Sequence, residues 1–214
     1  MSTLLKMMLL LGCFSVQALA SEVKLEKMKV ATDKPALARG ADGLMTNCHS
    51  CHSMKYIKYR DLANLGLDKQ KVDGWRGDQP LDAPVLAQMS ENDAMLSFAK
   101  VPPDLSLMAQ ARDGGANYVY SYLIGYYVAP DGTPGNHVFP GTRMPDPLGI
   151  SGATDVAQRS EMQNTAKDIV SFLSWAADPH AGERIRLGYY VIGYLLLLTG
   201  LLYLVKKQIW SRLK

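Results

Sequence analysis

Five consecutive residues, Cys48-His49-Ser50-Cys51-His52, combine two thiols and an imidazole at a spacing that suits covalent attachment of a haem. Two thiols three positions apart can each form a thioether with one of the two vinyl groups of the porphyrin. The histidine directly after the second thiol then lies beneath the macrocycle, where its imidazole can bind the iron. The run therefore predicts a c-type haem held by Cys48 and Cys51, with His52 as one axial ligand.

Two other chemistries also use paired cysteines. A structural zinc site needs four protein ligands, but no cysteine follows Cys51, and His137 and His180 lie far apart in the sequence. A thioredoxin-like dithiol follows a buried strand, whereas residues 35–45 indicate a short, glycine-interrupted helix. The pattern therefore favours haem over zinc and over a redox dithiol.

The N-terminal residues have the form of an export signal. A lysine near the start is followed by an apolar segment over residues 7–14 and by Ala18-Leu19-Ala20, which resembles a signal-peptidase site. We therefore expect residues 1–20 to be a signal peptide. Leu10-Leu11-Gly12-Cys13 also resembles a lipoprotein cleavage site, so processing at Cys13 is an alternative.

A second apolar segment near the C-terminus predicts a membrane anchor. Residues 187–205 are nineteen residues without a charge, about 28 Å as a helix and close to the thickness of the hydrocarbon core. Tyrosines and Trp210 lie towards its ends, and the Lys and Arg residues that follow place the C-terminus in the cytoplasm. We expect residues 184–214 to form the anchor and short tail, and residues 21–183 to be exported.

The exported segment is acidic although the whole chain has a net charge of +3. Residues 21–183 hold 16 Lys and Arg against 20 Asp and Glu, which gives −4. Either an acidic face for a basic electron-transfer partner or ordinary solubility accounts for this balance. The sequence has no basic patch with interleaved aromatic residues, so it gives no indication of nucleic-acid binding.

Helical periodicity predicts a mainly α-helical domain with long irregular loops. Short helices are expected around residues 36–46, 59–65, 90–99 and 115–126. A stronger one is expected over residues 165–177, where apolar residues recur at helical spacing and Thr165-Ala166-Lys167-Asp168 resembles a capping box. Strands are poorly supported. About 160 exported residues make one domain of ordinary size, with part of its core supplied by the cofactor.

The second axial ligand decides the chemistry of the iron. A thioether raises the potential and suits electron transfer, whereas an open position favours ligand binding or catalysis. Met144 lies in an irregular segment between Pro140 and Pro145, where helix packing does not account for a methionine. The residues alone leave Met144 and His137 as rival sixth ligands.

Four stretches resemble the cytochrome c1 family, the membrane-anchored haem subunits of quinol–cytochrome c oxidoreductase (bc1) complexes. Arg39-Gly40 with residues 48–54 resembles the attachment region, and Phe139-Pro140-Gly141 with Met144-Pro145 resembles the sixth-ligand loop. The most specific stretch is residues 100–107 with Ala111-Arg112, Gly114-Gly115 and residues 117–126. Residues 168–179, together with the apolar span, resemble the C-terminal part of that family.

The resemblance implies a cytochrome c-like fold with one covalent haem c and makes Met144 the sixth ligand. It adds six pocket residues to Cys48, Cys51, His52 and Met144, namely Pro102, Pro103, Arg112, Tyr118, Leu123 and Phe139. Arg112 is expected to pair with a haem propionate, with a surface ion pair to Asp113 as the alternative. Arg143 departs from the small or apolar residue expected beside the ligand.

The resemblance also implies a one-electron relay that performs no bond chemistry of its own. A Rieske iron–sulfur subunit, supplied by quinol oxidation at cytochrome b, would reduce the haem, and a soluble or tethered cytochrome c would receive the electron. One alternative is a tethered c-type cytochrome that serves a different terminal oxidase or dehydrogenase; another is a five-coordinate haem sensor or peroxidase. The expected location is the bacterial cytoplasmic membrane, with one span among the lipids and the haem domain on the periplasmic side.

Overall fold

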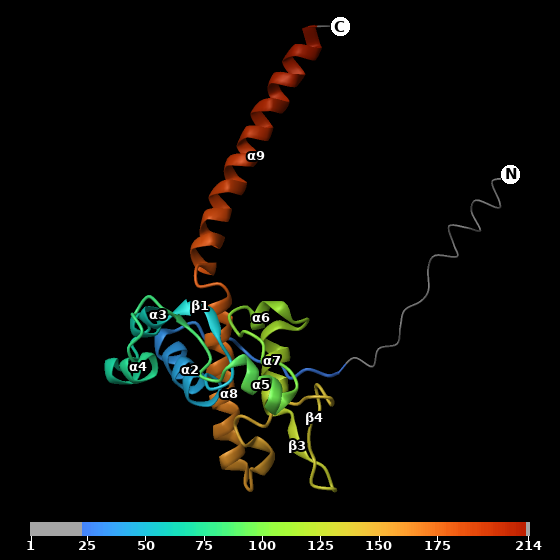
Figure 1. Ribbon diagram of the computed structural model, residues 1–214. Coiled ribbons are helices and arrows are strands. Elements are labelled where there is room, and N and C mark those ends of the chain that lie inside the picture. The colour runs from blue at the N-terminus through green and yellow to red at the C-terminus, as the bar shows by residue number, and fades with distance from the viewer. Residues whose placement is uncertain (1–22, 213–214) are drawn as a thin grey trace, which may run out of the picture.

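A computed structural model describes residues 23–212 of the chain (Figure 1). The predicted signal peptide, residues 1–20, and the alternative site at Cys13 lie outside the described residues. The described part forms a mainly helical body from which one long helix, α9 (Ala181–Arg212), extends away. The mainly α-helical fold class expected from the sequence is therefore confirmed.

Two crossing helices, α2 (Lys34–Asn47) and α8 (Val156–Ala177), form the centre of the body. The carboxylate of Asp33 caps α2 by accepting a hydrogen bond from the Ala36 amide at 3.0 Å. The two helices approach closely at Gly40, because a Cβ placed there would lie 2.0 Å from the carbonyl oxygen of Asp168. Beside that contact, the guanidinium of Arg39 donates to the Asp168 carboxylate at 2.7 Å.

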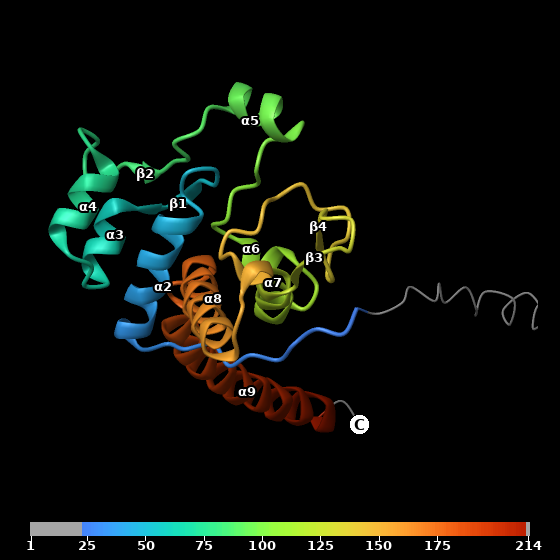
Figure 2. The same cartoon turned by 90° about the horizontal axis from the view of Figure 1, so that it is seen from below.

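A third helix, α7 (Gly115–Ile124), packs against α8, with the short helix α6 (Met108–Ala111) next to both. Figure 2 shows α2, α8 and α7 as neighbours, with α5 (Glu91–Phe98) apart from α8. The three larger helices bury most of the core between them. Its fully buried members include Leu44, Ala41, Ala166, Ile169, Val170 and Phe172. The body therefore has one continuous apolar core that fixes the position of the α2 C-terminus.

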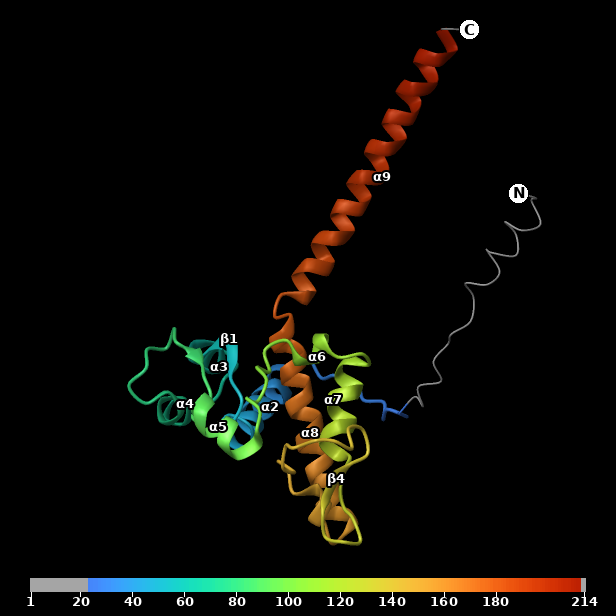
Figure 3. The same ribbon diagram turned by 45° about the vertical axis from the view of Figure 1, so that its right-hand side comes forward.

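The chain after the cysteine motif forms small elements around this core. β1 (Met54–Lys58) pairs antiparallel with β2 (Pro84–Val85), and α3 (Tyr59–Asn64) and α4 (Lys69–Arg76) lie between the two strands in the sequence. A hairpin of β3 (Tyr126–Val128) and β4 (Pro134–Asn136) follows α7, and a short turn of helix, η1 (Ile150–Gly152), precedes α8. Figure 3 shows the hairpin at the end of the body opposite to α9.

Several sequence predictions of helix position are corrected by the structure. α8 begins at Val156, nine residues before the predicted start. Asp155 caps it by accepting from the Gln158 amide, and Thr165 lies inside the helix, where its hydroxyl donates to the Glu161 carbonyl. The capping box predicted at Thr165 is therefore wrong. Helices α4 and α6 and the four short strands were also not predicted.

The long helix α9 confirms the apolar span predicted over residues 187–205. It has 32 residues, and its most apolar part is not buried against the body. An exposed surface of this size and apolarity is stable in lipid rather than in water. The chain is therefore anchored in a membrane through α9.

Candidate functional site

The cysteine motif follows directly from the C-terminus of α2. The amides of Cys51 and His52 both donate to the carbonyl of Cys48, at 3.1 and 2.9 Å, and this turn brings the three residues together. Cys48 is buried and Cys51 is half-buried. Burial raises the pKa of the Cys48 thiol to about 12, so the thiol stays protonated. Both cysteines are free of disulfide bonds, as thioether formation requires.

The environment of His52 fits an axial ligand to haem iron. Its imidazole is buried, with Nδ1 2.7 Å from the carbonyl oxygen of Pro103. Because a carbonyl oxygen only accepts hydrogen bonds, Nδ1 holds the proton and Nε2 keeps its lone pair. Burial also lowers the pKa of His52, which favours the neutral imidazole. The residues present therefore suit a c-type haem, with Cys48 and Cys51 as attachment points and His52 as a ligand.

The middle of the motif is fixed by a second buried histidine to which the sequence assigned no role. His49 is 2% exposed, and its Nε2 donates to the carbonyl of Leu86 at 2.8 Å. Ser53 extends the attachment, because its hydroxyl accepts from the Ala87 amide at 2.9 Å. These contacts hold the motif against the segment that follows β2.

The loop with Met144 is attached to two different parts of the body. Met144 is half-buried, its carbonyl accepts a hydrogen bond from the Tyr126 hydroxyl at 3.2 Å, and its amide donates to the Thr142 hydroxyl at 3.2 Å. The neighbouring Arg143 donates from Nη1 to the carbonyl of Phe98 at 3.2 Å, at the end of α5. The arginine that departed from the family pattern therefore ties the loop to α5.

Both candidate ligand loops are hydrogen-bonded to the same short segment. Arg143 binds the carbonyl of Phe98, and His52 binds the carbonyl of Pro103. Phe98 and Pro103 are five positions apart in the sequence, so their carbonyls are at most about 18 Å apart. Segment 98–103 thus links the loops of His52 and Met144.

The other predicted pocket residues differ in exposure. Leu123 is buried in α7, and Tyr118 is half-buried, with its ring stacked at 6.4 Å on that of Tyr122. Pro102 lines a cavity of about 300 Å³ beside Cys51, together with Ser53, Leu86 and Asp104.

Two further predicted pocket residues are exposed. Phe139 is 52% exposed. Arg112 is also exposed, and among residues 23–212 it forms no ion pair with Asp113. Their contacts with haem stay predictions.

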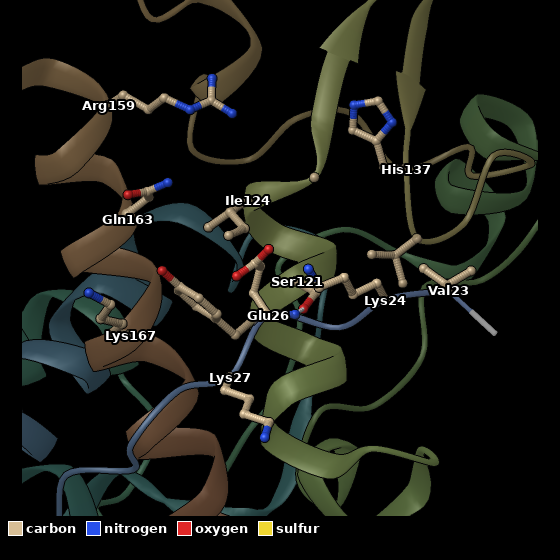
Figure 4. A pocket seen from close by; sticks show the side chains of 13 residues that line it. Val23, Lys24, Glu26, Lys27, Ser121, Ile124, His137, Arg159, Gln163 and Lys167 are labelled. Atoms are coloured by element: carbon tan, nitrogen blue, oxygen red, sulfur yellow. Dashed lines mark hydrogen bonds between the residues drawn. The ribbon is translucent and has the colours of Figure 1, made fainter. Parts of the chain in front are cut away.

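The rival sixth ligand, His137, lies on a different surface. Its ring stacks on that of Tyr127 with 4.3 Å between centroids, and the residue is exposed. It borders a cavity of about 480 Å³ between the N-terminal segment, α7 and α8 (Figure 4). The cavity lining includes several charged and polar side chains, namely Lys24, Glu26, Lys27, Arg159, Gln163 and Lys167. Neither His52 nor Met144 lines this cavity, which is distinct from the candidate haem site.

The ligands of a structural zinc site do not come together in the described part of the chain. Within residues 23–212, no group of three or more His, Cys, Asp or Glu side chains is arranged to hold a metal ion. Within this range, the cysteine pair therefore lacks the further side chains that a tetrahedral zinc site requires.

Comparisons with known proteins agree with the motif. The sequence profile of the Cytochrome C1 family matches residues 24–213. The chain is 30% identical to the ammonia monooxygenase gamma subunit of Nitrosomonas europaea, over 94% of each chain. It is 30% identical to the cytochrome c1 of Rhodospirillum rubrum, over 85% of this chain and 83% of that one. It is 32% identical to the cytochrome c1 of Allochromatium vinosum, over 84% of this chain and 85% of that one.

A solved structure titled "Hyperthermophilic respiratory Complex III" contains a chain of similar fold. The TM-score is 0.53 at 21% sequence identity, and the match covers 99% of this chain and 97% of the other. At this level of identity the likeness concerns the fold. It extends over the helical body and α9 together.

Proposed function

Because the chain belongs to the cytochrome c1 family, we propose that it is the membrane-anchored haem subunit of a quinol–cytochrome c oxidoreductase. Haem c, when bound, supplies a one-electron redox centre. The observation with the most weight is the hydrogen bond from His52 Nδ1 to the Pro103 carbonyl, since it leaves Nε2 available to iron. The protein itself makes and breaks no substrate bond.

Each site residue has a separate task in this proposal. Cys48 and Cys51 would hold the porphyrin through thioethers, and His52 and Met144 would bind the iron. Pro102, Pro103, Tyr118, Leu123 and Phe139 exclude water from the pocket, and Arg112 neutralises a propionate. Exclusion of water and a thioether ligand both favour the reduced state, which raises the midpoint potential.

The assignment of Met144 is tested by the substitution Met144→Leu in the haem-loaded protein. Leucine keeps the volume and apolarity of the side chain but has no sulfur, so the thioether-to-iron absorption band should disappear and the midpoint potential should fall. His137→Ala is the matched control and should leave the band and the potential unchanged. A band that persists in Met144→Leu would move the sixth ligand to another residue.

The partners follow from the same proposal. An iron–sulfur (Rieske) subunit working with cytochrome b would deliver the electron, and a soluble or tethered cytochrome c would remove it. The haem domain would lie on the periplasmic side of a bacterial cytoplasmic membrane, with residues 1–20 removed as a signal peptide. The positively charged residues after the apolar span support this orientation.

Purification of the tagged complex from the native membrane tests the assignment to this complex. We expect cytochrome b and an iron–sulfur subunit to co-purify with the chain, which should retain haem after denaturation. Isolation with a different terminal oxidase or dehydrogenase would replace the proposed complex. Carbon monoxide binding by most of the reduced native protein would indicate a five-coordinate iron and overturn the relay.

A further inference from the structure

Two tyrosines close a ring of hydrogen bonds around the backbone of Met144. The Met144 amide donates to the hydroxyl of Thr142 at 3.2 Å, and Thr142 is hydrogen-bonded to the hydroxyl of Tyr122. The hydroxyls of Tyr122 and Tyr126 are 3.1 Å apart, and that of Tyr126 is 3.2 Å from the Met144 carbonyl. Both polar groups of the Met144 backbone therefore belong to one network.

The Tyr126 hydroxyl is the donor in both of its contacts, to the Tyr122 hydroxyl and to the Met144 carbonyl. Its single proton is therefore shared between these two acceptors. The Thr142 oxygen accepts from the Met144 amide, and Thr142 and Tyr122 share a hydrogen bond in which either hydroxyl can donate. Loss of one hydroxyl interrupts the whole circuit.

The two tyrosines are themselves held by regular structure and by packing. Tyr122 lies near the C-terminus of α7, and Tyr126 begins β3. Their rings meet edge to face with 5.6 Å between centroids, and Tyr122 also stacks on Tyr118. Tyr126 is 2% exposed. The ring of hydrogen bonds thus connects an irregular loop to a part of the body with little freedom to move.

A thioether needs such support more than an imidazole does. It is a neutral, weak ligand, and the entropy of its loop opposes binding unless the loop is already ordered. We propose that Tyr122 and Tyr126 are positioning residues that hold Met144 at the iron. This inference rests on the proposed function, specifically on Met144 as the sixth ligand. In this inference the two tyrosines help to keep Met144 in the sixth coordination position of the iron.

The test substitutes each hydroxyl by hydrogen in the haem-loaded, full-length protein. Tyr126→Phe removes the donor to the Met144 carbonyl, and the fraction of reduced protein that binds carbon monoxide should rise about tenfold. The thioether-to-iron band should weaken, and the midpoint potential should fall. Tyr122→Phe interrupts the ring but spares the direct contact, so it should change the same quantities in the same direction by less.

The matched control is Tyr127→Phe. Tyr127 follows Tyr126 on β3, and its hydroxyl makes no hydrogen bond within residues 23–212. Carbon monoxide binding, the band and the potential should therefore equal those of the unmodified protein. Covalent haem content and far-ultraviolet circular dichroism verify that each variant is folded and loaded.

The outcomes separate this inference from the proposed function. An unmodified protein that lacks the band or binds carbon monoxide freely would show that the Met144 assignment itself is wrong. If Met144→Leu loses the band but Tyr126→Phe behaves like Tyr127→Phe, only the role of the tyrosines is overturned. Should Tyr126→Phe fail to load haem, Tyr122→Phe decides by the same measurements.

Discussion

His49, between the two cysteines, should make the stability of the protein depend on pH. Burial lowers the pKa of its native imidazole, which is almost fully enclosed and bonded to Leu86. In the unfolded chain a histidine titrates near pH 6.5. Above that pH neither state binds the proton. Below it the unfolded state binds it first, so the free energy of unfolding should fall until the pH passes the native pKa.

Denaturant unfolding of the haem-loaded protein between about pH 7.5 and about pH 5 measures this dependence. His49→Gln is the comparison, since its amide can still donate to the Leu86 carbonyl but does not titrate. The slope of stability against pH should be shallower in His49→Gln than in the unmodified protein. Equal slopes would show that other groups cause the acid sensitivity.

The residues of the candidate site differ in whether a short stretch of sequence is enough to identify them. Cys48, Cys51 and His52 were predictable because their chemistry depends on spacing within five residues. The bonds of His49 to Leu86 and of Tyr126 to Met144 span 37 and 18 residues. Only the folded chain brings such partners together, so no spacing rule could predict them. The sequence around Tyr122 and Tyr126 contains several tyrosines, and this was the one signal for the hydrogen-bond network. It does not identify the residue to which these tyrosines bond.

At the scale of elements, the crossing of α2 and α8 requires a glycine. A Cβ at position 40 would lie 2.0 Å from the Asp168 carbonyl oxygen and 2.8 Å from the Cβ of Phe172. Because the first of these atoms is backbone, the helices would have to separate. Gly40→Ala should therefore lower the free energy of unfolding by about 3 kcal/mol, the upper end of the range for overpacking.

Thermal or denaturant unfolding measures this effect, with Gly74→Ala as the control. Gly74 lies inside helix α4, and no atom is within 4 Å of the position where its Cβ would be. Alanine is the better helix former, so Gly74→Ala should raise the stability by up to about 1 kcal/mol. Similar destabilisation by both substitutions would show that the α2–α8 contact is not what makes Gly40 sensitive.

The elements that the sequence predicted are those with their own internal pattern. α2, α5 and α7 have local apolar periodicity or caps, and their predicted positions agree with the structure to within a few residues. The first nine residues of α8 lack an apolar stripe, and most of them are exposed. They are helical because the cap at Asp155 begins the helix and the buried second half extends it. The strands of two to five residues are too short for alternation to be detected.

At the scale of the whole molecule, the helical body and the anchor depend on each other little. The apolar part of α9 contributes no buried surface to the body. The junction has an ion pair between the exposed Arg184 and the half-buried Asp178, and an exposed contact between His180 and Glu183. Exposed pairs of this kind contribute at most about 1 kcal/mol. The candidate haem site is built from segments that precede α8, so its geometry should not require the membrane helix.

A chain that ends at Arg186 tests this independence, because it keeps the ion pair to Asp178 and removes the apolar span. After export and haem attachment it should be recovered as a water-soluble protein, whereas the full-length chain should stay in the membrane fraction. Its thioether-to-iron band and midpoint potential should equal those of the full-length protein in detergent. Its free energy of unfolding should agree within about 0.5 kcal/mol. A soluble product with a lost band or a shifted potential would show that α9 or its membrane partners help to form the haem pocket.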